Sequence, residues 1–271
     1  MKRRFRFYLL PAAIGCFLIF VTAYSSQNGS DVPRPLSYEM RNVDKVYQEG
    51  GEGAESDTYC KFRYPFFSDG EHAETINRYL LSRIANSISL SSVPGDSAGI
   101  TIEELADNFF AEYEAARKEF SVRWPYQFKL TGSVLLNRSD LLTVAFSYYA
   151  FTGGAHGNSY TEYLVFDTMT GKRLGLNDVF EEGFEERLNK LIDSRYRQMK
   201  GLSPTDRLDG EEGVLFKNVI HFNDNFALTD QGVSFFYNQY EIAAYAYGTT
   251  KIDLPYSDLS DLLKPGFRKI Q

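Results

Sequence analysis

The segment with the clearest chemical potential is Gly153-Gly154-Ala155-His156-Gly157, a glycine-rich loop between two strand-like runs. Glycine permits positive φ angles and a close approach of the backbone, so the loop should turn tightly and project His156. The imidazole could form hydrogen bonds or move a proton at a ligand cleft. It could equally lock the loop by bonding to neighbouring backbone, because the sequence identifies no catalytic partner for it. Both interpretations stay open.

Aromatic residues surround this loop, and the chain has 19 Tyr, 22 Phe and one Trp. Alternation along a strand sends half of such side chains into the core. The others could form a platform for sugar rings or for a protein partner, since tyrosine joins apolar area to a polar tip. The candidate ligand-binding residues are Gly153, Gly154, His156, Gly157, Tyr149, Tyr160, Tyr240 and Glu241. No residue is assigned a catalytic role.

Several other chemistries have no support in the sequence. The three histidines, His72, His156 and His221, show no metal-binding spacing, and there is no CxxC pair, so neither a metal nor a cofactor is expected. The nucleophile motifs GxSxG and SxxK are absent. No Lys-Ser/Thr follows the glycines to form a phosphate-binding loop. A pair of carboxylates for glycoside cleavage stays open, because two acids can meet from distant parts of a chain.

The N-terminus has the layout of a bacterial secretory signal. A basic run at residues 2–6 precedes a mostly apolar stretch over residues 7–23. We expect residues 1–25 to be a signal peptide, with an uncleaved signal anchor as the alternative. Lipidation at Cys16 is a third possibility, because residues 13–16 partly resemble a lipobox. Residues 26–40 are polar and contain two prolines, which predicts a tether.

Charge and cysteine content agree with export to the periplasm or the cell surface. The chain has 29 Lys and Arg against 36 Asp and Glu, and 25 against 36 remain after residue 23. This acidic balance argues against nucleic-acid binding, and it limits membrane attachment to the N-terminal segment. It suits a cationic partner. Cys60 is the one cysteine after Cys16, and its surroundings predict a half-buried strand residue without nucleophilic function.

Hydrophobic periodicity predicts elements that are segregated along the chain. Strands are expected at 43–47 and 58–64, the second closed by Pro65, and helices at 73–89 and 102–120, the latter capped by Thr101. A period of two over 124–174 indicates an antiparallel meander. The remaining expected elements are a helix at 184–200, a short helix near 214–220, and strands at 225–228, 233–237 and 251–255.

This order of elements predicts an α+β fold in which an antiparallel sheet meander packs with a few helices. About 230 residues follow the tether, enough for one large or two small cores. We expect two subdomains, an N-terminal α+β subdomain at 41–120 and a C-terminal α+β domain at 121–271 that carries the glycine-rich loop.

Residues 146–157, continued by 163–172, resemble a bacterial extracytoplasmic domain family of unknown function whose members carry a Gly-Gly-Ala-His-Gly signature. Residues 226–243 and 248–263 resemble the C-terminal half of that family, and residues 57–90 resemble the small domain that often precedes it. Relatives include the ectodomain of RsiV-type lysozyme-sensing anti-sigma factors and domains beside peptidoglycan deacetylase domains. The resemblance implies a binding or sensing module.

Two functions from different classes follow. The first is a non-catalytic envelope protein that binds or senses cell-wall glycan, meaning peptidoglycan, or a cationic wall-acting protein such as lysozyme. The second is a wall-acting hydrolase in which His156 works with a carboxylate from another segment. Only four residues precede Phe5, so no cytosolic sigma-binding segment is expected, and a stand-alone envelope protein is the preferred interpretation.

Overall fold

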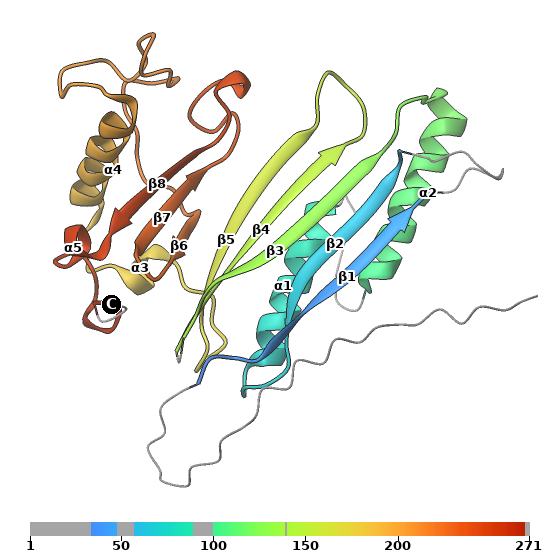
Figure 1. The fold of residues 1–271 in the computed structure, drawn as a ribbon, viewed down its shortest axis with the longest axis horizontal. Helices are drawn as coiled ribbons and strands as arrows, with labels where there is room; N and C mark the ends of the chain where they lie inside the picture. Colours follow the sequence, from blue (N-terminus) through green and yellow to red (C-terminus); the bar gives the residue numbers. More distant parts are fainter. Residues whose placement is uncertain (1–33, 48–56, 89–99, 139, 269–271) are drawn as a thin grey trace, which may run out of the picture. The chain divides into compact units, whose positions relative to one another are not determined.

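The computed structural model describes residues 34–47, 57–88, 100–138 and 140–268. The larger of its two sheets has five strands in the order β1-β2-β3-β4-β5 (Figure 1). These strands are β1 Tyr38–Val46, β2 Tyr59–Phe67, β3 Gln127–Asn137, β4 Leu141–Phe151 and β5 Asn158–Asp167. All neighbours are antiparallel except β2 and β3, which pair in parallel from Tyr59↔Gln127 to Arg63↔Thr131. The sheet is therefore mixed, with an antiparallel meander over β3 to β5.

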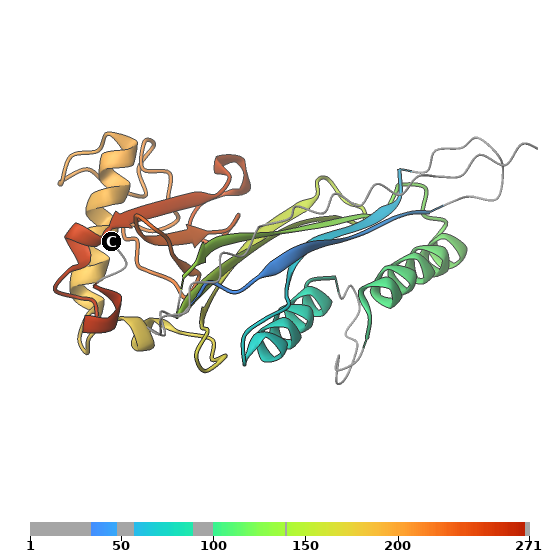
Figure 2. The same ribbon diagram turned by 60° about the horizontal axis from the view of Figure 1, so that its bottom comes forward.

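Two helices cover one face of this sheet, as Figure 2 shows. They are α1 Ala73–Ile88 and α2 Ile102–Phe120, and they lie in sequence between the parallel strands β2 and β3. A parallel pair needs such a long connection, because a tight turn can only reverse the chain. Each helix buries a stripe at helical spacing, such as Ile76, Leu80 and Ile84 in α1. Thr101 caps α2 in a capping box with Glu104.

The smaller sheet is antiparallel and contains β6 Phe226–Leu228, β7 Gly232–Tyr237 and β8 Thr250–Pro255. With it pack α3 Leu176–Val179, α4 Glu185–Lys200 and α5 Tyr256–Leu259, and two 3-10 turns lie at η1 Tyr245–Tyr247 and η2 Pro265–Phe267. A second hydrophobic core forms here, and α4 contributes Leu188, Ile192 and Tyr196 to it. Strands β3 to β5 of the larger sheet also contribute to this core. A third, small cluster joins the two sheets and includes Ala145, Tyr163 and Ala227.

The α+β class and most of the expected elements are confirmed, including the pairing of residues 43–47 with 58–64 and the three C-terminal strands. Pro65 does not close β2, which continues to Phe67. No helix forms at 214–220. Instead, Val214 has a positive φ of 59°, and Leu215 and Ile220 enter the core from turns.

The structure can be compared with the expected signal segment, tether and subdomain border in turn. The signal segment and residues 26–33 lie outside the described residues. The end of the expected tether is folded, because β1 begins at Tyr38 and Leu36 exchanges two backbone hydrogen bonds with the Asn137 side chain, at 3.0 and 2.8 Å. The border expected between residues 120 and 121 crosses the large sheet, which takes β1 and β2 from one side and β3 to β5 from the other. That two-part division remains a prediction.

Candidate functional site

The glycine-rich loop between β4 and β5 is held by aromatic side chains from three other segments. His156 Nδ1 donates to the Gly157 carbonyl oxygen at 3.0 Å, and its ring stacks on Tyr245 with centroids 3.8 Å apart. The Tyr245 hydroxyl donates to the same carbonyl at 3.2 Å. Among the described residues, no carboxylate hydrogen-bonds to His156. This geometry locks the loop and supplies no acid–base pair.

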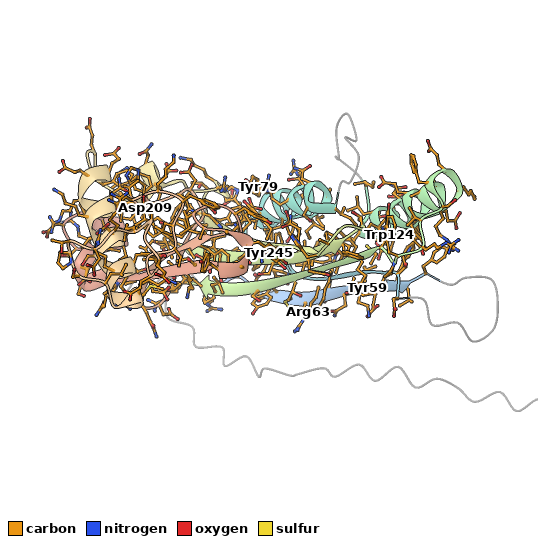
Figure 3. All side chains as sticks on the ribbon, turned by 90° about the horizontal axis from the view of Figure 1, so that it is seen from above. Tyr59, Arg63, Tyr79, Trp124, Asp209 and Tyr245 are labelled. Carbon is orange, nitrogen blue, oxygen red and sulfur yellow. The ribbon has the colours of Figure 1, made fainter. Side chains whose placement is uncertain are left out.

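Two glycines make this close packing possible. Gly153 has a φ of 121°, and a Cβ there would collide with the indole of Trp124, whose Nε1 donates to the Thr152 carbonyl at 2.7 Å. A Cβ on Gly157 would overlap the ring of Tyr149. Trp124 and Tyr245, both labelled in Figure 3, contact the loop from different parts of the chain. The glycines are therefore required for packing against aromatic rings.

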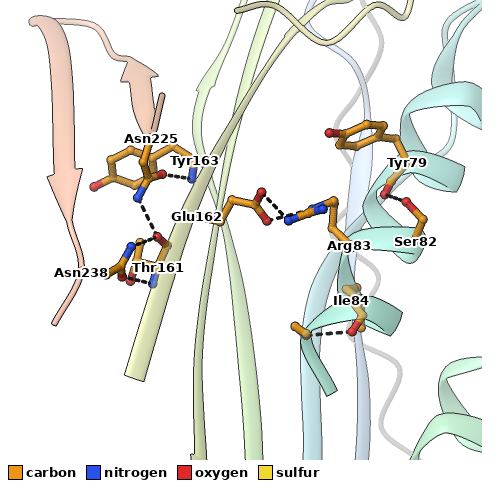
Figure 4. Close-up of polar contacts among 10 residues, drawn as sticks. Tyr79, Ser82, Arg83, Ile84, Thr161, Glu162, Tyr163, Asn225 and Asn238 are labelled. Carbon is orange, nitrogen blue, oxygen red and sulfur yellow. Dashed lines mark hydrogen bonds and ion pairs between the residues drawn. The ribbon is translucent and has the colours of Figure 1, made fainter. Parts of the chain in front are cut away.

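The outer edge of β5 is covered by the side chains of two asparagines that flank strands of the smaller sheet, Asn225 before β6 and Asn238 after β7 (Figure 4). Asn238 Oδ1 accepts from the Thr161 N–H at 2.7 Å, and Asn225 Oδ1 accepts from the Tyr163 N–H at 2.8 Å. Both side-chain amides donate back to the Thr161 carbonyl, at 3.0 and 2.8 Å. An exposed strand edge is a site for unwanted pairing, and these amides replace the missing neighbouring strand.

A groove of about 610 Å³ follows this edge of β5, and we call it the edge groove. Its lining is polar and aromatic, from Asn158, Ser159, Tyr160, Glu162, Tyr163, Arg173, Asn223, Asp224, Asn225, Asn238, Gln239, Tyr240 and Glu241. Small-molecule pockets of this volume are usually lined by apolar residues. A groove rich in amides, carboxylates and phenols instead suits a ligand that carries many hydroxyl and amide groups.

One stretch of the groove presents unpaired backbone. Alternate residues of an edge strand turn both N–H and C=O away from the sheet, and Thr161 does so toward Asn225 and Asn238. Ser159, two residues earlier, has the same orientation and lines the groove. Among the described residues, no side chain bonds to its N–H or C=O. A ligand in the groove can therefore reach one free donor and one free acceptor on the backbone.

Two carboxylates of the groove, Glu162 and Glu241, are held by partners. Arg83 from α1 binds both oxygens of Glu162, at 2.8 and 3.1 Å (Figure 4). Glu241 accepts from the Asn238 N–H at 2.8 Å and from Asn223 Nδ2 at 2.6 Å. Burial raises the pKa of Tyr160, and the nearby charges of Glu162 and Glu241 raise it further. These carboxylates act as fixed acceptors that order the walls of the groove.

Tyr240 is the most exposed aromatic side chain of the groove. It is 56% exposed and sits in a turn with a positive φ of 64°, uncommon for a residue with a bulky side chain. The turn is closed by Glu241, whose N–H donates to the Asn238 carbonyl at 3.1 Å and whose carboxylate accepts from the Asn238 N–H. Backbone held in an unfavourable region is concentrated at functional sites, so Tyr240 is the first residue to test.

The candidate residues named from sequence fall into three places. Tyr160, Tyr240 and Glu241 line the edge groove. His156, Gly153 and Gly154 lie in the loop, outside the groove lining, while Tyr149 and Gly157 pack together beside it.

Sequence reasoning missed the asparagines at 158, 223 and 225, as well as Ser159 and Glu162. The density of Asn around 223–225 and 238 is a signal that could have pointed to them.

The structure describes no group of three or more His, Cys, Asp or Glu side chains that could hold a metal ion. In the same part of the chain, none of the helices combines the length and the apolarity that crossing a bilayer would require.

Two families match separate parts of the chain. The family described as deacetylase PdaC matches residues 52–159, and the one described as protein of unknown function (DUF3298) matches residues 177–257. The peptidoglycan-N-acetylmuramic acid deacetylase PdaC of Bacillus subtilis (strain 168) is 25% identical over 126 residues, which are 45% of this chain and 26% of that protein. The matched region thus spans about a quarter of this relative.

Two solved structures share the fold. A DUF3298 family protein from Bacteroides fragilis NCTC 9343 is 20% identical with a TM-score of 0.65, covering 89% of this chain and 100% of its own. Another, from Pseudomonas aeruginosa PAO1, is 22% identical with a TM-score of 0.63, covering 87% and 97%. The chain is therefore similar to PdaC in its N-terminal part and to a family of unknown function in its C-terminal part, within one shared fold.

Proposed function

We propose that this protein is a non-catalytic cell-envelope protein that binds the glycan of peptidoglycan along the edge groove. The observation that carries the proposal is the polar lining of the groove, in which Tyr240 is displayed by a strained turn and Ser159 offers free backbone groups. Sugar rings pack on exposed tyrosine, and their hydroxyl and acetamido groups can bond to amides and backbone. The similarity of residues 52–159 to the PdaC family supports a wall ligand.

The proposal places the protein outside the cytoplasmic membrane. The basic and apolar segment over residues 1–25 supports export, and the similarity to a peptidoglycan deacetylase supports a location at the cell wall. Binding, and not deacetylation, is proposed, because the region shared with PdaC is a quarter of that enzyme. A cationic wall-acting protein such as lysozyme is the second ligand to consider, since the chain has a net charge of −7.

A hydrolase that uses His156 receives less support. The imidazole is stacked on Tyr245, and its Nδ1 is engaged by a backbone carbonyl. A general base needs a substrate proton within hydrogen-bond reach, and His156 does not line the edge groove. The position of this residue therefore favours the structural role over the catalytic one.

Co-sedimentation of the full chain with purified peptidoglycan sacculi tests the proposal. We expect binding without release of soluble fragments, and we expect Tyr240→Ala to weaken it about tenfold, the effect of losing an aromatic contact worth about 1.4 kcal/mol. Tyr247→Ala is the matched control, because Tyr247 is also 56% exposed but does not line the groove. Equal binding by both variants would place the ligand elsewhere, and released fragments would favour the hydrolase.

A further inference from the structure

The face of the large sheet that points away from α1 and α2 carries an ordered set of cationic and aromatic side chains. We call it the open face, and Figure 3 shows Tyr59 and Arg63 on it, on the side of the sheet opposite the helices. Its central residues are Tyr59, Lys61 and Arg63 of β2, Gln127, Lys129 and Thr131 of β3, and Ser147 and Tyr149 of β4. All eight are half-buried or exposed. None of these eight residues lines the edge groove, although Tyr149 is the register partner of Ser159 at its border.

Strand register places two lysines side by side on the open face. Lys61 and Lys129 are direct partners in the parallel β2–β3 pair, so their side chains leave the same face of adjacent strands about 4.8 Å apart. Arg63 follows two residues later on the same face. Like charges directly opposite each other on a sheet are destabilising. The fold therefore tolerates a local repulsion that an anion would relieve.

The described acidic residues neutralise only part of this charge. Lys61 pairs with Asp44 of β1 at 3.2 Å. Within the described residues, neither Arg63 nor Lys129 has an acidic partner, although the chain as a whole carries a net charge of −7. Two of the three cations in this cluster thus lack an acidic partner among the described residues. Such a cluster is complementary to an external anion.

Aromatic rings lie directly beside these cations. Lys61 Nζ is 5.3 Å from the centre of the Tyr59 ring, and Tyr149 is the register partner of Lys129. Tyr59 of β2 and Tyr149 of β4 lie on either side of β3, in neighbouring rows of the register. Burial raises the pKa of Tyr59, and the neighbouring Tyr149 raises it further. Tyrosines flanking a charged centre provide surfaces for sugar rings, while the cations take the anionic groups.

Hydroxyl groups continue the pattern at the row of Arg63. Thr131 is its register partner, and next along the row Ser147 Oγ lies 2.9 Å from Thr161 Oγ1 of β5. Arginine, lysine and hydroxyl side chains together are the usual ligands of phosphate oxygens, which accept hydrogen bonds from several directions. A planar carboxylate would use fewer of these donors.

We propose that the open face binds a phosphate-bearing polysaccharide that lies across β2, β3 and β4. Phosphate groups contact Lys61, Lys129 and Arg63, and sugar rings lie on Tyr59 and Tyr149. This site differs from the edge groove in position and in ligand charge, so the inference goes beyond the proposed function and does not depend on it. A long nucleic acid carries closely spaced charges and would be repelled by the acidic remainder of the chain. A phosphate-bearing glycan places its charges farther apart, so this repulsion is weaker.

The test measures binding of the full chain to a fluorescent glycerol phosphate polymer that bears sugar substituents. Arg63→Gln combined with Lys129→Gln should weaken binding at least tenfold and reduce its dependence on salt, because two charged contacts are lost. Lys200→Gln combined with Lys217→Gln is the control. Both lysines are exposed and lie outside the open face. Replacing them removes two positive charges, as the Arg63 and Lys129 substitutions do.

Four outcomes would overturn the proposal. They are an equal loss in both double variants, no binding by the wild type, equal binding of neutral dextran, and equal binding of oligothymidylate, which would indicate a general polyanion surface. Binding to sacculi stripped of phosphate polymers provides the independent reference. We expect Tyr240→Ala to reduce it and the Arg63 and Lys129 variant to leave it unchanged, so failure of one site is distinguishable from failure of the other.

Discussion

His156 stacks on Tyr245, with ring centroids 3.8 Å apart and planes 20° from parallel, although the two residues are 89 positions apart in the chain. Both side chains donate to one acceptor, the Gly157 carbonyl. The pair therefore ties the loop between β4 and β5 to the η1 turn that precedes β8. Of the two roles that the sequence leaves open for His156, this geometry matches the one that locks the loop, as a clamp between segments.

Replacing His156 with alanine should lower the free energy of unfolding by about 1 kcal/mol, because the ring contact and the bond to Gly157 are lost. Urea unfolding followed by circular dichroism measures this change. Sacculus binding should stay within about twofold of the wild type, because His156 does not line the edge groove. Tyr245→Phe keeps the stacking and removes only its bond, so it should cost less. Unchanged stability with lost function would contradict the clamp.

Much of the fold could be predicted from local patterns. The capping box of Thr101 and Glu104 and the stripe of Ile76, Leu80 and Ile84 depend on residues a few positions apart. The parallel β2–β3 pair could not, because its strands are separated by two helices. The apolar spacing at 214–220 suggested a helix, but the core takes Leu215 and Ile220 from turns instead.

The candidate site was less accessible to sequence reasoning. Tyr160, Tyr240 and Glu241 were identified because tyrosines and acids stand out beside turns. The asparagine side chains that cover β5 act on backbone groups 62 to 77 residues away, and nothing local signals such a contact. The register that places Lys61 beside Lys129 likewise depends on which strands become neighbours.

Asn225 should be the most sensitive side chain of the strand edge. Asn225→Ala removes the acceptor for the Tyr163 N–H and the donor for the carbonyls of Thr161 and Phe236. Because these part-buried backbone groups would be left without partners, we expect the free energy of unfolding to fall by about 2 kcal/mol. Chemical denaturation of purified variants measures it.

Asn42→Ala is the matched control for this change, because Asn42 is exposed on β1 and makes one long 3.4 Å bond to Met40. It should alter stability by less than about 0.5 kcal/mol. Equal effects of the two substitutions would mean that water replaces the Asn225 amide, and that the edge of β5 needs no protein cover.

Cys60 should resist thiol reagents in the folded protein. Its side chain is fully buried in β2, and burial raises the pKa of the thiol, so little of the reactive thiolate forms. In a Cys16→Ser background, Cys60 should react with a maleimide at about pH 8 at least roughly 100-fold more slowly than free cysteine. Concentrated guanidinium chloride should restore the rate. Rapid labelling without denaturant would place Cys60 in an accessible site.

Tyrosine ionisation should make the fold sensitive to alkali. Burial raises the pKa of Tyr163 to about 12, and Asp253 adds to the shift. In the unfolded chain a tyrosine ionises near pH 10. The folded state therefore favours the neutral phenol, and this contribution to stability is complete below about pH 10 and is lost as the pH rises toward about 12. The free energy of unfolding, measured in urea at stepped alkaline pH, should fall across this interval.

Tyr163→Phe removes the ionisable group but keeps the ring that packs edge-on against Phe236 at 5.7 Å. The decline in stability with pH should become shallower in this variant, while Tyr247→Phe, a change at an exposed ring, should leave the slope unchanged. Tyrosinate absorbance recorded on the same samples locates the ionisation itself. The buried phenol accounts for the fall in stability at alkaline pH only if removing it makes that fall shallower. Identical slopes in the wild type and Tyr163→Phe would therefore show that other groups cause the fall.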